Sequence, residues 1–133
     1  MKMRELKFRG RKNNGDWIFG SYIKTEEAPH HRIYYITEDG CDWNSSIHPD
    51  TLGQYTGMKD KNGVEIYEGD IVNGYVHNPE LLLVVQFLSS QYSCGFVATS
   101  RDSSAYTELW YDGFEIVGNI HENPELLENE NGR

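Results

Sequence analysis

The chain has 133 residues, with 21 Asp and Glu against 12 Lys and Arg, and carries a net charge of −9 at pH 7. A chain of this length fits one domain or two small lobes that share a core, and its negative field disfavours generic nucleic-acid binding because it repels phosphate groups. No apolar run approaches about 18 residues, which argues against a membrane-spanning helix, and without a signal-peptide pattern at the N-terminus we expect a cytoplasmic location.

The composition favours strands and turns over helices. Nine Tyr, three Trp and 13 Gly are typical of pleated strands joined by tight turns. The two cysteines, Cys41 and Cys94, match no metal-binding or redox spacing. We therefore interpret them as buried or partly buried free thiols in a reducing compartment.

Residues 4–9 alternate between apolar and polar side chains, which predicts a half-buried strand. The first twelve residues carry six basic side chains against one Glu, so the polar face of this strand is basic. The basic face has two interpretations: it pairs with the excess carboxylates, within the chain or between subunits, or it contacts an anion or nucleic acid through Arg4, Lys7 and Arg9. We favour the first, because the carboxylates are present in the same chain.

A turn at residues 13–16 joins this strand to a second one at residues 17–23, and the two form a hairpin. Gly20 within the second strand marks a bulge or a close approach of two backbones. The core candidates of this strand are Trp17, Phe19 and Ile23.

The next segment is predicted to be a polar loop at residues 24–31 and a third strand at residues 32–37. A short strand around residues 46–48 follows. It is expected to end at Pro49 and Asp50, which are typical turn residues.

Two glycine turns occur within residues 54–72, and we expect the chain to be organised around them. Asn62 and Gly63 can supply the two positive φ angles of a type I′ turn, which predicts a hairpin. At Gly69 a second turn leads into a new strand that begins at or near Asp70.

Four acids of this stretch have two interpretations: Asp60, Glu65, Glu68 and Asp70. As an oxygen-rich cluster they would suit a hard cation, although their spacing does not match the EF-hand loop. Acids beside tight turns more often accept hydrogen bonds from nearby backbone N–H groups. We therefore expect neither a metal site nor a cofactor.

The C-terminal half is predicted to contain longer apolar strands. These are expected at residues 71–77, 81–88, 94–98, 106–111 and 114–120. The run 81–88 is nearly unbroken, which favours a strand buried on both faces over a short helix. The last two strands are expected to pair through a turn at Asp112 and Gly113, and Asn123 and Pro124 to start one short helical turn.

Strands and turns at a spacing of about ten residues predict a mainly β fold. We expect an N-terminal β lobe at residues 1–53, a connecting hairpin at 54–69, a small SH3-like β barrel at 70–127 and an acidic tail at 128–133, all within a single compact unit. A sandwich in place of the barrel stays open, because periodicity does not separate the two.

Three segments together resemble the YopX family. Residues 54–72 resemble the family's hallmark, residues 4–9 its opening strand, and residues 117–127 its closing motif. The chain departs from the family pattern at residues 10–11, Gly-Arg, where Ala-Trp is common, and at His121, where Tyr is frequent. The resemblance implies a small protein encoded by a phage or prophage and working in a bacterial host cell, and it brings no established activity, substrate or catalytic residue.

The sequence contains no nucleophile-base, phosphate-loop or helical metal-ligand pattern, so we expect a protein that is not an enzyme. Aromatic residues near turns and strand ends would form a recognition surface if they stay exposed. Tyr55, Trp110 and Tyr111 are the candidates for such a surface. Trp43 and Tyr67 are instead expected to be buried in the seam between the lobes.

Three functions follow from these patterns. The favoured one is a non-enzymatic accessory protein that binds an unknown protein partner or forms a homo-oligomer. The second is a nucleic-acid binder that uses the basic N-terminal strand. The third is a metal-dependent enzyme with an acidic site at residues 60–70.

Overall fold

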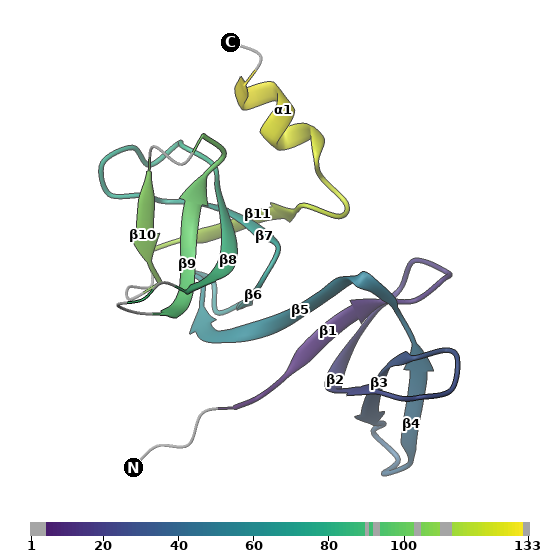
Figure 1. Ribbon diagram of the computed structural model, residues 1–133. Coiled ribbons are helices and arrows are strands. Elements are labelled where there is room, and N and C mark those ends of the chain that lie inside the picture. Colours follow the sequence, from purple (N-terminus) through teal and green to yellow (C-terminus); the bar gives the residue numbers. More distant parts are fainter. Residues whose placement is uncertain (1–4, 90, 92–93, 103–104, 110–112, 132–133) are drawn as a thin grey trace. The chain divides into compact units, whose positions relative to one another are not determined.

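The computed structural model describes residues 5–89, 91, 94–102, 105–109 and 113–131, and Figure 1 shows the path of the chain. These residues form a mainly β fold with two antiparallel sheets and one short helix. The chain divides into two compact units, Met1–Tyr55 and Thr56–Arg133. No described helix has both the length and the apolar run needed to cross a membrane.

The N-terminal unit is built from consecutive antiparallel strands. They are β1 (Phe8–Arg11), β2 (Trp17–Lys24), β3 (His31–Ile36), β4 (Asp42–Ser46) and the first part of β5 (His48–Lys59). In the described residues the sheet has the order β4-β3-β2-β1-β5-β6, where β6 (Glu65–Tyr67) follows the boundary between the units. The predicted second and third strands are confirmed, and the first strand begins at Phe8, later than predicted.

Gly20 lies where β2 changes its pairing partner. The first half of β2 pairs with β1, with Gly20 opposite Phe8, and the second half pairs with β3, with Ser21 opposite Tyr34. A Cβ atom on Gly20 would lie 2.1 Å from the carbonyl oxygen of Tyr34, a distance that no side chain allows. The predicted close approach of two backbones at this glycine is therefore confirmed.

The core side of β2 is the opposite of the predicted one. Phe19 and Ile23 are 47% and 42% exposed, whereas Tyr22 lies opposite the fully buried Ile33 and its ring is 5.9 Å from that of Phe8. Because side chains alternate along a strand, a shift of one residue moves the whole apolar set to the other face. The prediction of Phe19 and Ile23 as core residues is wrong for this reason.

Pro49 does not end a strand as predicted, because β5 begins at His48 and continues through it. The register between β1 and β5 shifts here, so that Arg11 is opposite His48 while Arg9 is opposite Gly53. The extra residues of β5 have no partner in the regular pairing with β1. Proline, which lacks an N–H group, is tolerated at such a position. Inside this bulge the hydroxyl of Thr51 accepts a hydrogen bond from the Arg11 N–H over 2.9 Å.

Among its described residues the second unit contains the rest of β5, six further strands and the helix. They are β6, β7 (Asp70–Asn73), β8 (Leu83–Ser89), β9 (Cys94–Ser100), β10 (Tyr106–Glu108), β11 (Glu115–Asn119) and α1 (Glu125–Asn131). In the described residues β7 to β11 form an antiparallel sheet with the order β10-β9-β8-β7-β11.

The predicted hairpin near Asn62 and Gly63 is present, but its turn is of another type. The Gly63 N–H donates to the Asp60 carbonyl over 3.0 Å, so Lys61 and Asn62 are the two central residues. Gly63 follows them with a φ of +83°, which is the glycine position after a hairpin turn and not the second position of a type I′ turn. The second predicted turn, at Gly69, is confirmed by its φ of +93° and by the start of β7 at Asp70.

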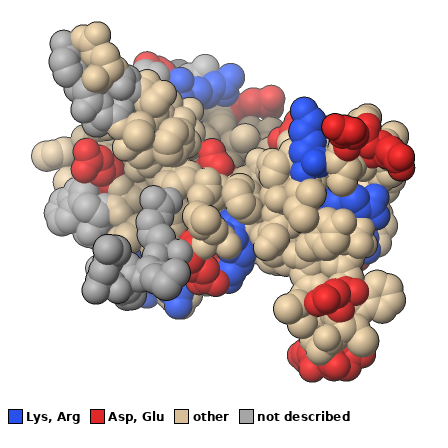
Figure 2. Space-filling model, turned by 60° about the horizontal axis from the view of Figure 1, so that its bottom comes forward, with Lys and Arg blue, Asp and Glu red and all other residues tan. Residues whose placement is uncertain are grey.

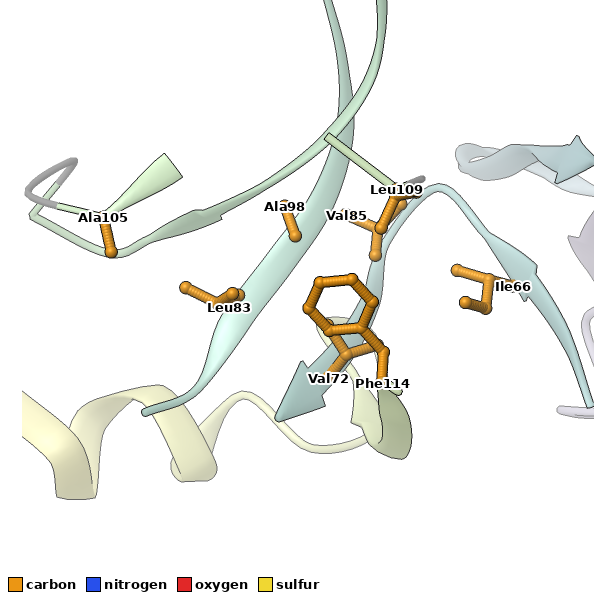
Figure 3. Packing of buried hydrophobic residues seen from close by; sticks show 8 residues of the cluster. All are labelled: Ile66, Val72, Leu83, Val85, Ala98, Ala105, Leu109 and Phe114. Atoms are coloured by element: carbon orange, nitrogen blue, oxygen red, sulfur yellow. The ribbon is translucent and has the colours of Figure 1, made fainter. Parts of the chain in front are cut away.

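The core of the second unit is an apolar cluster around Phe114, which is fully buried. Figure 3 shows its ring lying among Val72, Leu83 and Val85. The cluster consists of Ile66, Val72, Leu83, Val85, Ala98, Ala105, Leu109 and Phe114.

The strand predicted at residues 81–88 is buried only in its first part. Leu83 and Val85 are buried, whereas Phe87 and Leu88 are 48% and 40% exposed. The helical alternative for this run is excluded, but the predicted burial on both faces is wrong, because the end of β8 extends past the core.

The last two strands do not form the predicted pair. β10 pairs with β9 and β11 pairs with β7, so they lie at opposite ends of the strand order. The sheet is therefore not closed among the described residues. Asp112 of the predicted turn lies outside them.

The closing segment forms a hydrogen-bonded turn before α1. The Asn119 side chain accepts hydrogen bonds from the N–H groups of His121 and Glu122 over 3.0 and 2.9 Å. The Asn123 side chain accepts from the Asn119 N–H over 3.1 Å, and its Oδ1 would lie 2.6 Å from a Cβ atom on Gly118. The helix then continues to Asn131, so the predicted single turn is too short and the predicted tail is partly helical.

We predict that Phe114→Ala lowers the free energy of unfolding of the second unit by about 3–5 kcal/mol, because it leaves a cavity in a closed cluster. Phe87→Ala removes the same side chain from an exposed site and is expected to cost about 1 kcal/mol or less. Urea unfolding followed by circular dichroism measures both. Equal losses in the two variants would show that the core lies elsewhere.

Candidate interaction surface

The residues proposed from the sequence for a binding site do not form one exposed surface. Tyr55 is only 5% exposed, and the ammonium group of Lys7 lies 5.6 Å from its ring centroid. Lys7 also lies 3.3 Å from a carboxylate oxygen of Glu5. Three further candidates, Arg4, Trp110 and Tyr111, lie outside the described residues.

The arginines of β1 contact an aromatic ring of the same unit. The guanidinium groups of Arg9 and Arg11 lie 4.7 and 5.9 Å from the ring centroid of Trp17, within the range of cation–π attraction. Arg9 is buried, and the Arg11 Nε donates to the Gly15 carbonyl over 3.0 Å. We predicted carboxylates as partners of this basic face. In the structure the carboxylate of Glu5 contacts Lys7, and further contacts of these cations are with the Tyr55 and Trp17 rings and the Gly15 carbonyl.

Basic side chains are also dispersed elsewhere on the surface. Figure 2 shows the described Lys and Arg side chains in small groups among Asp and Glu side chains, with no continuous basic area on that face. Within the sequence, residues 1–55 carry eight basic and eight acidic side chains, and residues 56–133 carry four and thirteen. The negative charge of the chain therefore belongs to the second unit.

Large apolar side chains gather on one face of β2 and β3, which we name the outer face. Ser21 is directly opposite Tyr34, so residues that alternate with these two share their face of the sheet. The large apolar members, with exposed fractions of 47%, 42%, 37% and 73%, are Phe19, Ile23, Tyr34 and Ile36. Sequence reasoning missed this surface because both faces of β2 carry apolar residues.

Two aromatic residues predicted to be buried have different environments. Tyr67 is 2% exposed, and its hydroxyl donates to the Glu65 carboxylate over 3.1 Å. Trp43 in β4 is 54% exposed, so the prediction of its burial is wrong. The free thiols of Cys41 and Cys94 are exposed as well, against expectation.

The Asp60 carboxylate organises the hairpin between β5 and β6. Its Oδ1 accepts hydrogen bonds from the N–H groups of Asn62 and Val64, both over 2.9 Å. Its Oδ2 accepts from the N–H of Ile116 in β11 over 3.1 Å. One buried carboxylate therefore holds a turn in shape and connects it to the last strand of the unit.

These contacts set the charge state of Asp60. Burial raises the pKa of the carboxyl group, but the hydrogen bonds from the Val64, Ile116 and Asn62 N–H groups and the nearby Lys61 charge lower it, and the net pKa lies below the ordinary 3.8. Asp60 is therefore ionised at neutral pH although it is only 5% exposed.

The other acids of this stretch also have structural contacts. Asp70 is 2% exposed and accepts a hydrogen bond from the Tyr67 N–H over 2.8 Å, which closes the turn at Gly69. Among the described residues no three His, Cys, Asp or Glu side chains come together in a way that could hold a metal ion. The geometry of Asp60 and Asp70 is that of turn-forming acceptors.

We predict that Asp60→Asn lowers the free energy of unfolding by about 1–3 kcal/mol at pH 7, because an amide N–H₂ group replaces one of the two acceptors of buried N–H groups. Because the folded pKa is depressed, the ionised carboxylate stabilises the fold above the unfolded pKa, and this contribution is lost as the pH falls through the folded pKa. The difference between wild type and variant should therefore be constant above about pH 5 and shrink below pH 3.8.

Urea unfolding at a series of pH values measures this difference. Asp50→Asn serves as the control, since it removes the same charge from an exposed site and should change stability by less than about 0.5 kcal/mol. A loss in Asp60→Asn that does not change with pH would contradict the role assigned to the ionised carboxylate.

Comparison with known proteins places these features in a family. A crystal structure described as protein EF1440 from Enterococcus faecalis is similar to this chain, with a TM-score of 0.57 and 25% sequence identity over 94% of this chain and 99% of that one. No curated protein matches. The family model described as YopX protein matches residues 4–128, which include the Asp60 hairpin and the closing turn. The chain therefore belongs to the YopX family.

Proposed function

We propose that this protein is a phage- or prophage-encoded accessory protein that binds a protein partner, or a second copy of itself, through the outer face. The observation that carries the proposal is the exposure of four large apolar side chains on one sheet face, where Ile36 reaches 73%. Contiguous exposed apolar surface is typical of protein-binding sites. Membership of the YopX family supports the phage origin.

The proposal includes the absence of catalytic activity. Its support is the use of the polar groups in the hallmark stretch, where Asp60 and Asp70 accept hydrogen bonds from backbone N–H groups. A general base or metal ligand needs a lone pair directed at a substrate or an ion, and these oxygens are directed at the chain itself. The free thiols Cys41 and Cys94 fit the proposed location in the reducing cytoplasm of a bacterial host.

We further propose that the second unit is an SH3-like barrel with one open side. In its strand order, β10-β9-β8-β7-β11, the strands β7 to β10 follow one another along the chain. The last strand, β11, returns to pair with β7. The cluster around Phe114 fills the space that such strands enclose. Small barrels of this kind are stabilised by one layer of inward side chains, with the loops free for recognition.

Nucleic-acid binding by the basic N-terminal segment is the second candidate, because Lys7, just before β1, and Arg9 and Arg11 within it alternate along the chain. The contacts of these cations with Tyr55, Trp17 and Glu5 argue against it, and so does the net charge of −9. A gel shift at low salt distinguishes the two functions. Binding of single- or double-stranded nucleic acid that Lys7→Ala weakens would favour this candidate over a protein partner.

The outer face is tested with the double variant Phe19→Ser and Ile36→Ser. We expect at least a tenfold lower recovery of the partner when the tagged protein is captured from host cells that carry the phage, because two apolar anchors are lost. The matched control is Phe87→Ser with Leu88→Ser, which removes similar exposed side chains from β8 and should leave recovery unchanged.

Mass spectrometry of the captured material and light scattering of the purified protein measure the two forms of association. Recovery that survives the outer-face variant, with a monomer in solution, would contradict the proposed surface.

A further inference from the structure

We propose that the free edge of β4 takes up an extended basic peptide as an added strand, with a basic side chain beside Asp42 and an apolar one beside Trp43. This inference rests on the proposed protein-binding function and names the chemistry of the partner. Addition of a strand to a sheet edge is a common mode of peptide recognition, in which backbone hydrogen bonds give affinity and flanking side chains give specificity.

The first observation is the position of β4 at one end of the strand order. It pairs with β3 alone among the described residues, and it lacks lysine, proline and a bulge, which usually protect such edges. Exposed edges with unpaired N–H and C=O groups are templates for another strand. Asp42 is the single charged residue of β4.

The hydrogen bonds at both ends of the hairpin show which backbone groups of β4 face outward. Thr37 N–H donates to the Cys41 carbonyl over 3.0 Å, and Ile47 N–H donates to the His31 carbonyl over 3.1 Å. In an antiparallel pair the residues with inward hydrogen bonds alternate with those that face away. Positions 43 and 45 are therefore bonded to β3, and positions 42, 44 and 46 direct their N–H and C=O groups outward.

The second observation is the kind of side chain that flanks this edge. Asp42 lies opposite Ile36, which is 73% exposed, so a carboxylate and an apolar side chain lie side by side on one face of the sheet. A lysine or arginine directly opposite Asp42 in the added strand would place its charge beside this carboxylate. On the other face Trp43 lies opposite Tyr35 and is 54% exposed, which suits an apolar side chain of the added strand.

The third observation is the charge of the hairpin, which selects a basic peptide over an acidic one. The β3–β4 hairpin carries one Arg, Arg32, which contacts Asn44, against the three carboxylates of Glu38, Asp39 and Asp42. Hydrogen bonds from the Thr37 hydroxyl and the Cys41 N–H lower the pKa of Asp39, so this carboxylate is charged at neutral pH. Complementary charge steers association and fixes the orientation of the bound strand.

A second copy of the chain fits this edge less well. Antiparallel pairing of two β4 strands about Asn44 would place each Asp42 opposite a Ser46 and would bring six carboxylates together with only two Arg32 side chains. The basic peptide compensates them, and the self-pairing becomes one outcome of the test.

The test uses a fluorescein-labelled octapeptide of alternating Lys and Val, with an octapeptide of alternating Glu and Val as the control ligand. Alternation places all Lys side chains on one face of the added strand and all Val side chains on the other. Fluorescence anisotropy with the full chain should show saturable binding of the Lys peptide, weakened by salt, and at least tenfold weaker binding of the Glu peptide.

The edge itself is tested with Asn44→Pro, which removes an outward N–H group without touching the bonds to β3. Asn44 also accepts a hydrogen bond from Arg32 Nε over 2.5 Å, so Asn44→Ala is the matched control that loses this bond and keeps the N–H. We expect at least a tenfold loss of peptide affinity in Asn44→Pro and less than twofold in Asn44→Ala. An unchanged circular dichroism spectrum verifies the fold of both variants.

Equal affinity of wild type and Asn44→Pro, or no binding of the Lys peptide, would overturn the proposal. A wild-type dimer that Asn44→Pro converts to a monomer would replace the peptide by a second copy. If the Lys peptide does not bind, while Phe19→Ser with Ile36→Ser still abolishes capture of a partner, the proposed function stands. Only the proposal that the β4 edge binds a peptide is then wrong.

Discussion

One buried carboxylate connects the β5–β6 hairpin of the second unit to β11. Asp60 accepts hydrogen bonds from Asn62 and Val64 in its own turn and from Ile116, which lies in a strand more than fifty residues later. A charge buried in this way is stable only where several donors surround it, and backbone N–H groups provide these donors without a counter-ion in direct contact. The hairpin at Asp60 thus connects two segments that are distant in sequence, and Asp60 and Asp70 accept hydrogen bonds from the backbone.

In the N-terminal unit the corresponding constraint is steric. At Gly20 the backbones of β2 and β3 approach so closely that a side chain would clash with the Tyr34 carbonyl oxygen. The fully buried Ile33 packs beside this contact. The face of β2 that carries Phe19 and Ile23 is the exposed one. The surface that we connect with partner binding lies on this face.

The turns could be predicted from the sequence, because a glycine beside Asn, Asp or Glu has few alternatives; the reversals near Gly63 and Gly69 are both present. Which face of a strand is buried could not be predicted, since β2 carries apolar residues at consecutive positions. The pairing with the neighbouring strand determines which of these residues face the core. Burial was predicted wrongly for residues 81–88, because an apolar run does not reveal where the core ends, and for Trp43, which was expected in the seam between the lobes. The candidate surface was missed because both faces of β2 carry apolar residues, whereas the role of Asp60 as a turn acceptor was anticipated from local chemistry.

The central claim is that the hallmark carboxylate of Asp60 is an ionised acceptor for three backbone N–H groups. Its most direct test is a nuclear magnetic resonance titration that follows the Asp60 carboxyl carbon together with the amide protons of Asn62, Val64 and Ile116. The account predicts that all four signals shift with one common pKa below 3.8 and that added Mg²⁺, Mn²⁺ or Ca²⁺ leaves that pKa unchanged. A carboxyl group that titrates at or above 3.8 independently of the three amides, or that responds to a divalent cation, would contradict it.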